Sequence, residues 1–434
     1  MFIKTETKKD QLMKEKRLFK GTYLPPDGFD SVFYRRKALL LDGINGNVAD
    51  ALIKLGFEVM TVNDISRQDL LDLMPNVRFL AVRSKTKITA EILEAGKSLI
   101  ACGRGGAGLD SIDVKTASEL GIICFACPGA NAESVAEVAL SHILTVLHKM
   151  PVGALGLNQG NWRKKECKGS SLFGKTVGLV GMGYVAKWLS KLLEPYNVRI
   201  ISYDIDPAAA LPWIPFVNDL SELLAESDIV SLHIPSSVET KGMFNNSLLS
   251  KFKPGATLIN CARGDLVLPQ AIIDSLESGQ LGYYAADVFS PEPPNFSKDE
   301  LFSRPDLIQS GRLYLTPHLA ANSDQAQNNV ADMLIEQFKR LFVYGEMPWG
   351  SNFPKFHLPK SGVRRLVVIH KDSQGVIAEI SQYLSTFANI AGNVNRRIEP
   401  GGTAYTVFDL DKKVGRSQTE LIEGIKGVLR AYVL

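Results

Sequence analysis

Residues 176–194 read TVGLVGMGYVAKWLSKLLE. The apolar run at its start predicts a buried strand, and the apolar residues of its second half recur at helical spacing. Between them lies GMGYVA (181–186), which has the pattern G-x-G-x-x-A. Gly181 permits a tight turn, Gly183 lets a pyrophosphate approach the backbone, and the small Ala186 suits close helix–strand packing. This strand–turn–helix unit predicts a dinucleotide-binding fold, with the phosphates at the helix N-terminus.

The next predicted strand ends at Asp204, about 20 residues beyond the glycines, as expected for such a unit. A carboxylate at this place accepts hydrogen bonds from the ribose hydroxyls and repels a 2′-phosphate, so the sequence favours NAD over NADP as the cofactor. The alternative is a tight turn that binds nothing. The order of strand, glycines, helix and acidic residue favours the cofactor site.

Short apolar stretches alternate with helical patterns on both sides of this unit. RRKALLLDG (35–43), LIACG (99–103), DIVSLHIP (228–235) and TLINCA (257–262) are typical of the strands. Such alternation predicts βαβ units, and therefore parallel sheets with helices on their faces. The length of 434 residues suits two or three domains.

The alternation stops at GEMPWGSNFPKFHLPKSG (345–362), whose prolines and glycines predict a linker. After it come a strand, a helix, two strands joined at Pro400-Gly401-Gly402, a second helix and a last strand. This order predicts a small ferredoxin-like βαββαβ unit over residues 363–434.

Composition narrows the class of protein. A net charge of +3, from 49 basic and 46 acidic residues, is too small to favour nucleic acid as a partner. No apolar run is long enough to span a membrane, and the lysine-rich N-terminus does not resemble a secretory signal. The five cysteines include a single C-x-x-C without a Cys/His cluster, which favours reduced thiols in a cytoplasmic protein and predicts no metal site.

Three further segments, INCARGDL, AADVFSPEPP and LYLTPHLAANSD, each begin as an apolar strand and end in polar residues. They supply Arg263, Asp287, Glu292 and His318 at the carboxyl ends of strands, where ligands bind in parallel sheets. Taken singly, each is equally well a surface or turn residue. Together they offer a clamp for a carboxylate, an imidazole that takes a proton, and an acid that orients the imidazole.

The ordered set G-x-G-x-x-[GA], N-x-[AS]-R-G, D-V-F-x-x-E-P and T-P-H resembles the D-isomer-specific 2-hydroxyacid dehydrogenases from about residue 36 to residue 434. VRSKTKIT (82–89), GAGLDSIDVKTASELG (106–121), NAESVAE (131–137) and the C-terminal tail are similar to the phosphoglycerate dehydrogenase branch of that family, the short type with one ACT domain.

The resemblance implies an α/β protein with two Rossmann-like, doubly wound parallel-sheet domains, an active site in the cleft between them, and a C-terminal ferredoxin-like ACT domain. The implied boundaries are an N-terminal arm (1–33), a discontinuous substrate domain (34–129 and 318–344), an inserted NAD-binding domain (130–317), a linker (345–362) and the ACT domain (363–434).

The implied reaction is the NAD-dependent oxidation of 3-phospho-D-glycerate to 3-phosphohydroxypyruvate, the first step of L-serine biosynthesis. In it, His318 is the general base, Glu292 stabilises its protonated form, and Arg263 holds the substrate carboxylate and polarises the C2 oxygen. Asp287 meets the nicotinamide carboxamide. The remaining cofactor contacts implied are Gly181, Gly183, Tyr184, Val185, Asp204, His233 and Ala262.

The resemblance also implies a substrate-phosphate loop and an effector site. The loop comprises Arg83, Ser84 and Lys85, with Arg104 beside it, and the N–H groups of Gly105 and Gly106 are candidates for the substrate carboxylate.

In serine-inhibited relatives the effector is held across an ACT dimer, here by His370, Asp372 and Asn389. Asp372 stands where the family usually has asparagine, and its charge repels a serine carboxylate. Pairing through both the nucleotide and the ACT domains predicts a homotetramer.

Two other functions stay open at this point. One is a hydroxypyruvate or glyoxylate reductase of the same family, whose substrate has no phosphate for the basic loop to bind. The other is a NAD-sensing binding protein like the corepressors built on this scaffold, which keep the Arg, Glu and His set but lack an ACT tail.

Overall fold

The computed structural model describes residues 36–355 and 357–434. The predicted N-terminal arm, residues 1–33, lies outside them. The chain forms two compact units: unit 1 contains the described residues up to Ala130 together with Asn328–Leu434, and unit 2 is Asn131–Gln327. The chain passes from unit 2 back to unit 1 after Gln327, ten residues beyond the boundary expected after residue 317. The reason is that the segment after His318 forms hydrogen bonds within unit 2.

Unit 1 begins with a five-stranded parallel sheet in the order β2-β1-β3-β4-β5. Its strands are apolar and, apart from the edge strand β2, almost wholly buried, as expected for a sheet covered on both faces. The strands are β1 (Arg36–Leu41), β2 (Phe57–Val62), β3 (Val77–Val82), β4 (Ala101–Arg104) and β5 (Ile123–Phe125). The helices between them are α2 (Gly46–Lys54), α3 (Arg67–Leu73), α4 (Ala90–Ala95) and α5 (Val114–Glu119).

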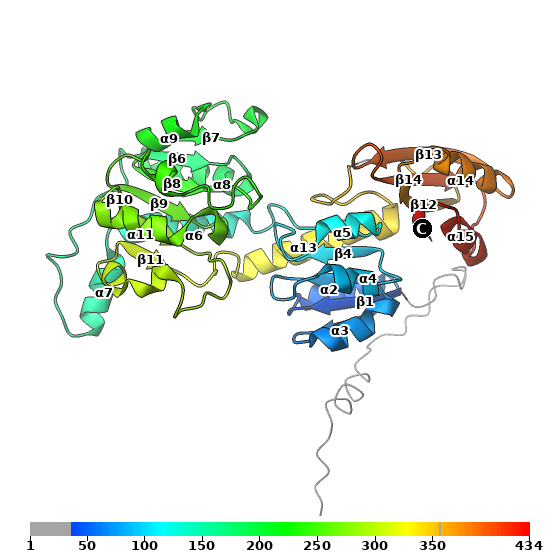
Figure 1. The fold of residues 1–434 in the computed structure, drawn as a ribbon, viewed down its shortest axis with the longest axis horizontal. Helices are drawn as coiled ribbons and strands as arrows, with labels where there is room; N and C mark the ends of the chain where they lie inside the picture. Colours follow the sequence, from blue (N-terminus) through cyan, green and yellow to red (C-terminus); the bar gives the residue numbers. More distant parts are fainter. Residues whose placement is uncertain (1–35, 356) are drawn as a thin grey trace, which may run out of the picture. The chain divides into compact units, whose positions relative to one another are not determined.

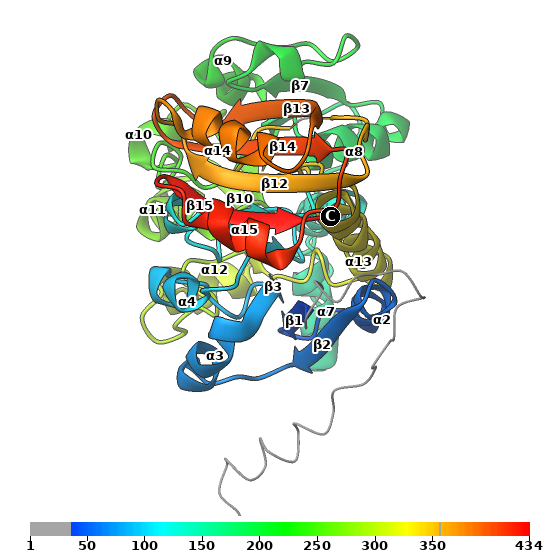
Figure 2. The ribbon, with the colours of Figure 1, turned by 90° about the vertical axis from the view of Figure 1, so that its right-hand side faces the viewer.

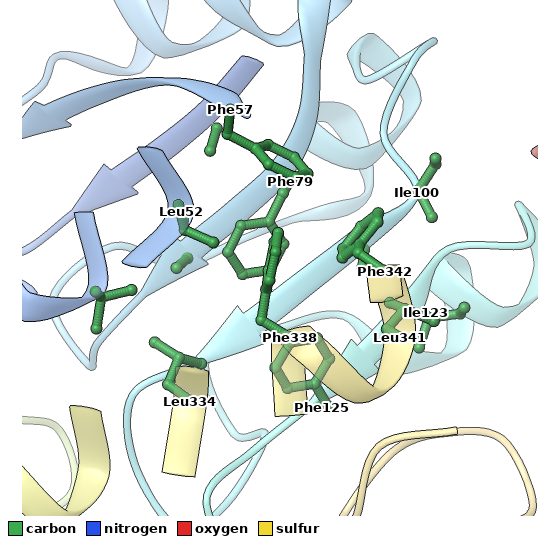
Figure 3. Close-up of a cluster of buried hydrophobic side chains, with 14 of the residues drawn as sticks. Leu52, Phe57, Phe79, Ile100, Ile123, Phe125, Leu334, Phe338, Leu341 and Phe342 are labelled. Carbon is green, nitrogen blue, oxygen red and sulfur yellow. The ribbon is translucent and has the colours of Figure 1, made fainter. Parts of the chain in front are cut away.

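Helix α13 (Asp324–Lys339) returns the chain to this sheet and closes its core (Figure 3). The Phe338 ring packs edge-on against Phe57 and Phe79, with centroid distances of 4.8 and 4.9 Å. Phe342, in the turn that follows α13, joins the same cluster. A core built from residues on both sides of unit 2 in the sequence explains why unit 1 is discontinuous.

Unit 2 contains a six-stranded parallel sheet in the order β11-β10-β9-β8-β6-β7 (Figure 1). The strands are β6 (Thr176–Val180), β7 (Arg199–Tyr203), β8 (Ile229–Leu232), β9 (Ala256–Asn260), β10 (Leu281–Ala286) and β11 (Leu313–Leu315). The helices are α6 (Ala132–Leu147), α7 (Met150–Asn158), α8 (Tyr184–Leu193), α9 (Leu220–Glu226), α10 (Asn246–Leu249), α11 (Pro269–Ser278) and α12 (Pro305–Gln309). The strand order reverses between β6 and β8, which is where such sheets bind ligands.

The C-terminal domain of unit 1 is a four-stranded antiparallel sheet in the order β13-β14-β12-β15. Its elements are β12 (Arg364–Lys371), α14 (Val376–Ser385), β13 (Ile390–Arg397), β14 (Thr403–Leu410), α15 (Arg416–Glu423) and β15 (Val428–Val433). Helices α14 and α15 cover the same face (Figures 1 and 2). Leu366 and Val368 pack in that layer, while Val367 and Ile369 join the core of the parallel sheet. The predicted fold class is confirmed in all three sheets.

Residues 345–355, the first part of the predicted linker, pack against the rest of unit 1. Met347 and Phe353 are buried. The Asn352 side chain accepts from the Cys124 N–H at 2.8 Å and donates to the Ser118 hydroxyl at 2.9 Å. These contacts tie the segment to the parallel sheet.

Within the described ranges, no single helix is long and apolar enough to cross a membrane. Helices α6 and α7 meet that test of length and composition only as a pair bent by 70°.

Candidate active site

The glycine loop that follows β6 has the geometry of a dinucleotide site. Gly181 has φ +93°, and a Cβ at this position would lie 2.8 Å from the carbonyl oxygen of His233. Glycine is therefore required where β6 meets β8. Around Gly183, in contrast, there is open space for a Cβ. Since α8 begins at the next residue, its free N–H groups face that space.

Asp204 lies directly after β7 and holds the glycine loop from the other side. Its Oδ2 accepts from the Met182 N–H at 2.7 Å, and its Oδ1 accepts from the Asp206 N–H at 3.0 Å. A carboxylate has about four acceptor positions, so room remains for a ribose hydroxyl. This arrangement fits the ribose of NAD.

His233 gives an independent sign of a ligand. Its Nε2 atom is buried and has no hydrogen-bond partner among the described residues. Burial lowers the pKa of His233 to about 3, so the ring is neutral at physiological pH. A buried polar atom without a partner is costly. Because His233 follows β8, beside Gly181, a bound dinucleotide would be placed to satisfy it.

His318 and Glu292 form a hydrogen-bonded pair. The Nδ1 atom of His318, after β11, lies 2.6 Å from Oε2 of Glu292, after β10. The second oxygen of Glu292 accepts from the Phe289 N–H at 2.9 Å. Since Nδ1 donates to the carboxylate, the lone pair of Nε2 is left for a substrate proton. The His318 side chain is 43% exposed, so a substrate can reach it.

The charge of Glu292 is set by opposing effects. Burial by itself raises the pKa of Glu292. Hydrogen bonds from His318 and Phe289 lower it, as do the nearby charges of His318 and Arg263, and together they outweigh the effect of burial. The net pKa is below the ordinary value, so the group is an anion at neutral pH. The charge of Arg263 therefore lies close enough to Glu292 to lower its pKa.

Arg263 is positioned by a turn that the sequence only hinted at. Asn260, the last residue of β9, is fully buried; its Oδ1 accepts from the Ala262 N–H, and its Nδ2 donates to the Arg263 carbonyl at 2.9 Å. At Gly264 a Cβ would lie 2.1 Å from the carbonyl carbon of Phe289, so the two loops touch through backbone. The N-x-A-R-G pattern contains this turn, but Asn260 was not among the predicted site residues.

Asp287 lies under the His318 loop and is fully buried. Its Oδ1 accepts from the Thr316 hydroxyl at 2.6 Å and from the Leu319 N–H at 3.0 Å, and its Oδ2 accepts from the Ala320 N–H at 2.8 Å. Three of about four acceptor positions are thus filled from within the loop.

Thr316 and its second partner, His142 on α6, were not among the predicted site residues. A lone histidine in an apolar helix gives no sequence signal of such a contact.

The remaining predicted cofactor residues lie on the same strand ends. Tyr184 is exposed and Val185 is half-buried in the first turn of α8, and Ala262 follows β9. The structure therefore places every predicted cofactor and catalytic residue in unit 2, at the carboxyl ends of its parallel strands.

The predicted phosphate residues lie in unit 1, after β3 and β4. Ser84 and Lys85 are exposed, and Lys85 forms an ion pair with Asp64. Arg104 donates to the Gly108 carbonyl at 2.6 Å and pairs with Asp110 at 3.3 Å. The N–H of Arg83 donates to Asp42. Two of the three cations thus have acidic partners, and a phosphate would compete with them.

The N–H groups of the glycine loop in unit 1 are also engaged. Gly105 donates to the Val82 carbonyl at 2.8 Å, and Gly106 donates to the Arg104 carbonyl at 2.9 Å. In this conformation they are not available to a substrate carboxylate, in contrast to the expectation from sequence.

The predicted effector residues do not converge within one chain. His370 is buried, with Nε2 at 2.8 Å from the Thr406 hydroxyl, and Asp372 pairs with Arg397 and the Gly401 N–H. The strand register places Asn389 at the opposite end of the sheet. Asn389 lines a pocket of about 420 Å³ together with Ser385, Thr386, Phe387, Ala388, Ile390, Asp411 and Lys412.

Comparison with known families and proteins agrees with this geometry. Residues 140–320 match the family described as D-isomer specific 2-hydroxyacid dehydrogenase, NAD binding domain. The chain is 31% identical to D-3-phosphoglycerate dehydrogenase of Haemophilus influenzae, over 92% of this chain and 97% of that protein. It is 38% identical to hydroxypyruvate reductase of Thermotoga maritima, over 65% of this chain and 90% of that protein.

A solved structure of the same family has a similar fold. The NAD+-bound 3-phosphoglycerate dehydrogenase of Entamoeba histolytica superposes with a TM-score of 0.61, at 26% identity, over 73% of this chain and 98% of that one. The cofactor predicted from the glycine loop and Asp204 is therefore confirmed as NAD.

Proposed function

The chain belongs to the D-isomer-specific 2-hydroxyacid dehydrogenase family, and on that premise we propose that it oxidises 3-phospho-D-glycerate to 3-phosphohydroxypyruvate with NAD. The observation that carries the proposal is the 2.6 Å contact between His318 and Glu292, with Arg263 beside them, at the strand ends that follow the NAD-binding loop.

The residues of unit 2 have separate tasks in this reaction. His318 Nε2 accepts the proton of the C2 hydroxyl, and the Glu292 anion stabilises the imidazolium that results. Arg263 holds the substrate carboxylate and polarises the C2 oxygen. The C2 carbon becomes a carbonyl when the C2–H bond breaks with its electron pair. NAD, held by the glycine loop and Asp204, would supply the acceptor for that hydride.

Unit 1 supplies the phosphate specificity in this proposal. Arg83 and Lys85 are the cations of the loop after β3, with Ser84 between them as a further donor. The Lys85–Asp64 pair is exposed at both ends, so it contributes little energy and a phosphate can displace Asp64. Arg104 keeps its contacts with Gly108 and Asp110 and does not bind the phosphate.

A specific observation supports a second candidate, a hydroxypyruvate reductase. The reductase of Thermotoga maritima is 38% identical over 65% of the chain, whereas the phosphoglycerate dehydrogenase of Haemophilus influenzae is 31% identical over 92% of it. The phosphoglycerate dehydrogenases match through the C-terminal domain as well, because their similarity covers 92% of the chain. This favours the phosphorylated substrate.

A substrate panel with purified protein tests the proposal. We expect kcat/KM for 3-phospho-D-glycerate to exceed that for D-glycerate by at least about 100-fold, since a site built for a polar group rejects analogues that lack it. Arg83→Met and Lys85→Met should reduce this ratio, and Lys87→Met, in the same loop, should not. Equal kcat/KM values for the two acids would overturn the phosphate assignment and favour the reductase.

We further propose that the C-terminal domain is an ACT domain and that the enzyme is a cytoplasmic homotetramer. The βαββαβ order and the unpaired edge of β13 support the first proposal. The exposed Met150 and Leu157 of α7 and the exposed Trp162 suit a subunit contact.

Serine is the effector to test. His370 already has hydrogen-bond partners, and Asp372 is an anion with lowered pKa, mainly because it accepts from Gly401. We therefore expect weak inhibition by serine, to be measured as the change in kcat/KM at millimolar serine.

A further inference from the structure

Three polar side chains lie behind the loop that carries His318. They are His142 on α6, Thr316 after β11 and Asp287 after β10. His142 Nε2 lies 2.9 Å from the Thr316 hydroxyl oxygen, which lies 2.6 Å from Asp287 Oδ1. His142 is 2% exposed and Asp287 is 0% exposed. We call these three residues the relay.

The hydrogen bonds of the relay require an extra proton. His142 Nδ1 lies 2.7 Å from the Val138 carbonyl, which can only accept, so Nδ1 carries a hydrogen. Thr316 has one hydroxyl hydrogen. If Thr316 donates it to the Asp287 carboxylate, it has none for His142, and Nε2 must then carry a hydrogen too. If Thr316 donates it to His142 instead, the hydrogen between Thr316 and Asp287 belongs to Asp287.

Both arrangements contain one proton more than a neutral imidazole and a carboxylate would hold. The relay as a whole is therefore neutral, which suits its burial, because an uncompensated buried carboxylate is costly. The net pKa of His142 is below its ordinary value, because burial lowers it more than the Val138 carbonyl and the charge of Asp287 raise it. The hydrogen-bond directions decide that the proton stays within the relay.

Two further ionisable groups face the relay. The Tyr314 ring from β11 lies 5.2 Å from the His142 ring, between centroids. Cys261, which follows β9, has a pKa raised by burial and further by Asp287, so it stays a neutral thiol. Neither group supplies a charge that replaces the proton of the relay.

The relay is joined directly to the backbone beside His318. Asp287 accepts from the N–H groups of Leu319 and Ala320, and Ser134 of α6 donates to the Ala320 carbonyl at 2.7 Å. These bonds hold His318 at φ +51°, in the left-handed region that a residue with a side chain rarely adopts. They also leave one acceptor position of Asp287 open.

We propose that His142 is a positioning residue: through Thr316 it keeps one proton beside Asp287, and so fixes the His318 loop and the Asp287 carboxylate beneath it, next to the cofactor site. The inference rests on the proposed roles of His318 and Asp287. It can be tested without the proposed substrate, because coenzyme binding alone reports it.

The experiment measures the Kd of NADH by fluorescence from pH 6 to 9.5. A His318→Ala parent is used, so that His318 itself does not titrate. Added to this parent are His142→Phe, Thr316→Val and Thr316→Ser. His148→Phe serves as the matched control, because His148 is an exposed residue at the C-terminal end of the same helix. Thermal unfolding of each variant reports whether it is folded.

We expect His142→Phe and Thr316→Val to weaken NADH binding about tenfold at neutral pH, as for loss of a hydrogen bond to a charged group. In the parent, in Thr316→Ser and in His148→Phe, Kd should rise in a one-proton step as the relay loses its proton, and this step should vanish in His142→Phe and Thr316→Val. Parent-like binding by a folded His142→Phe variant would overturn the proposal. If His142→Phe does not fold, the comparison of Thr316→Val with Thr316→Ser decides. Equal Kd values of NADH for these two variants would overturn the proposal.

Discussion

At the scale of single residues, the site depends on a few atoms whose partners decide what they can do. His318 donates from Nδ1 to Glu292, which leaves Nε2 as the basic atom. Glu292 is an anion because its hydrogen bonds and neighbouring charges outweigh its burial. The sequence predicted these two residues as a pair, since each follows a strand of the same sheet.

Replacing Glu292 tests the pair. Glu292→Gln should lower kcat by about 10- to 100-fold, because the imidazolium loses its anionic partner. The acid side of the kcat/KM profile should move to lower pH for the same reason. In the unchanged protein, the lowered pKa of Glu292 keeps it ionised at every pH above about 4.5, so activity lost near neutral pH has another source.

Glu292→Asp is the matched control, since it keeps the charge and shortens the side chain. Full activity of Glu292→Gln across the pH range would remove Glu292 from the mechanism.

At the scale of elements, the turns after parallel strands were predictable and the contacts between them were not. The strand and helix starts follow from apolar spacing and glycines, and residues on strand ends must gather at one edge of the sheet. Asn260 and Thr316 lie in the motifs N-x-A-R-G and T-P-H, but the motifs do not say what these side chains bind. Asn260 binds the backbone of Ala262 and Arg263 in its own turn. The partners of Thr316, His142 and Asp287, lie on other elements, and only the packed fold brings them within hydrogen-bond distance.

Asp204 makes the cofactor choice testable at this scale. Asp204→Ser should raise the ratio of kcat/KM with NADP to that with NAD by at least about tenfold, because the repulsion of the 2′-phosphate is removed. Asp206→Ser is the control, since the Asp206 carboxylate accepts from the Ala208 N–H two residues on, whereas that of Asp204 accepts from Met182 in the glycine loop. A ratio that stays unchanged in Asp204→Ser would show that another residue selects NAD.

At the scale of the whole molecule, one buried ion pair joins β12 and β14 of the C-terminal domain, and its arginine also binds the segment that precedes this domain. Arg365 is bidentate to Asp409, at 2.7 and 2.8 Å, and donates to the carbonyls of Tyr344 and Leu358. Both side chains are at most 2% exposed. The sequence predicted a linker over residues 345–362 but not its contact with Arg365, because a buried arginine cannot be told from a surface one by composition.

Arg365→Met should lower the free energy of unfolding by about 3–5 kcal/mol in urea titrations, since it leaves the buried Asp409 charge without its cation. Arg365→Met with Asp409→Leu should recover most of that loss. Arg67→Met, which breaks the exposed Arg67–Glu91 pair, should cost at most about 1 kcal/mol. A cost for Arg365→Met as small as that for Arg67→Met would contradict the structural role of the pair.

The same pair gives a pH dependence. Burial alone would raise the pKa of Asp409, but Arg365 and Ser361 lower it below the ordinary value of 3.8. Its contribution to stability is therefore present above about pH 4 and is lost as the pH falls through the lowered pKa. Unfolding followed between pH 3 and 7 should show this loss in the unchanged protein and not in the double variant.

The most direct measurement for the whole account is single-turnover formation of NADH from 3-phospho-D-glycerate by His318→Gln, with the Kd of NADH measured in parallel. The account predicts a rate about 10³-fold below that of the unchanged protein, with NADH binding within about threefold, because the variant lacks the base but keeps the cofactor site. A variant that forms NADH at more than about one tenth of the unchanged rate would contradict it.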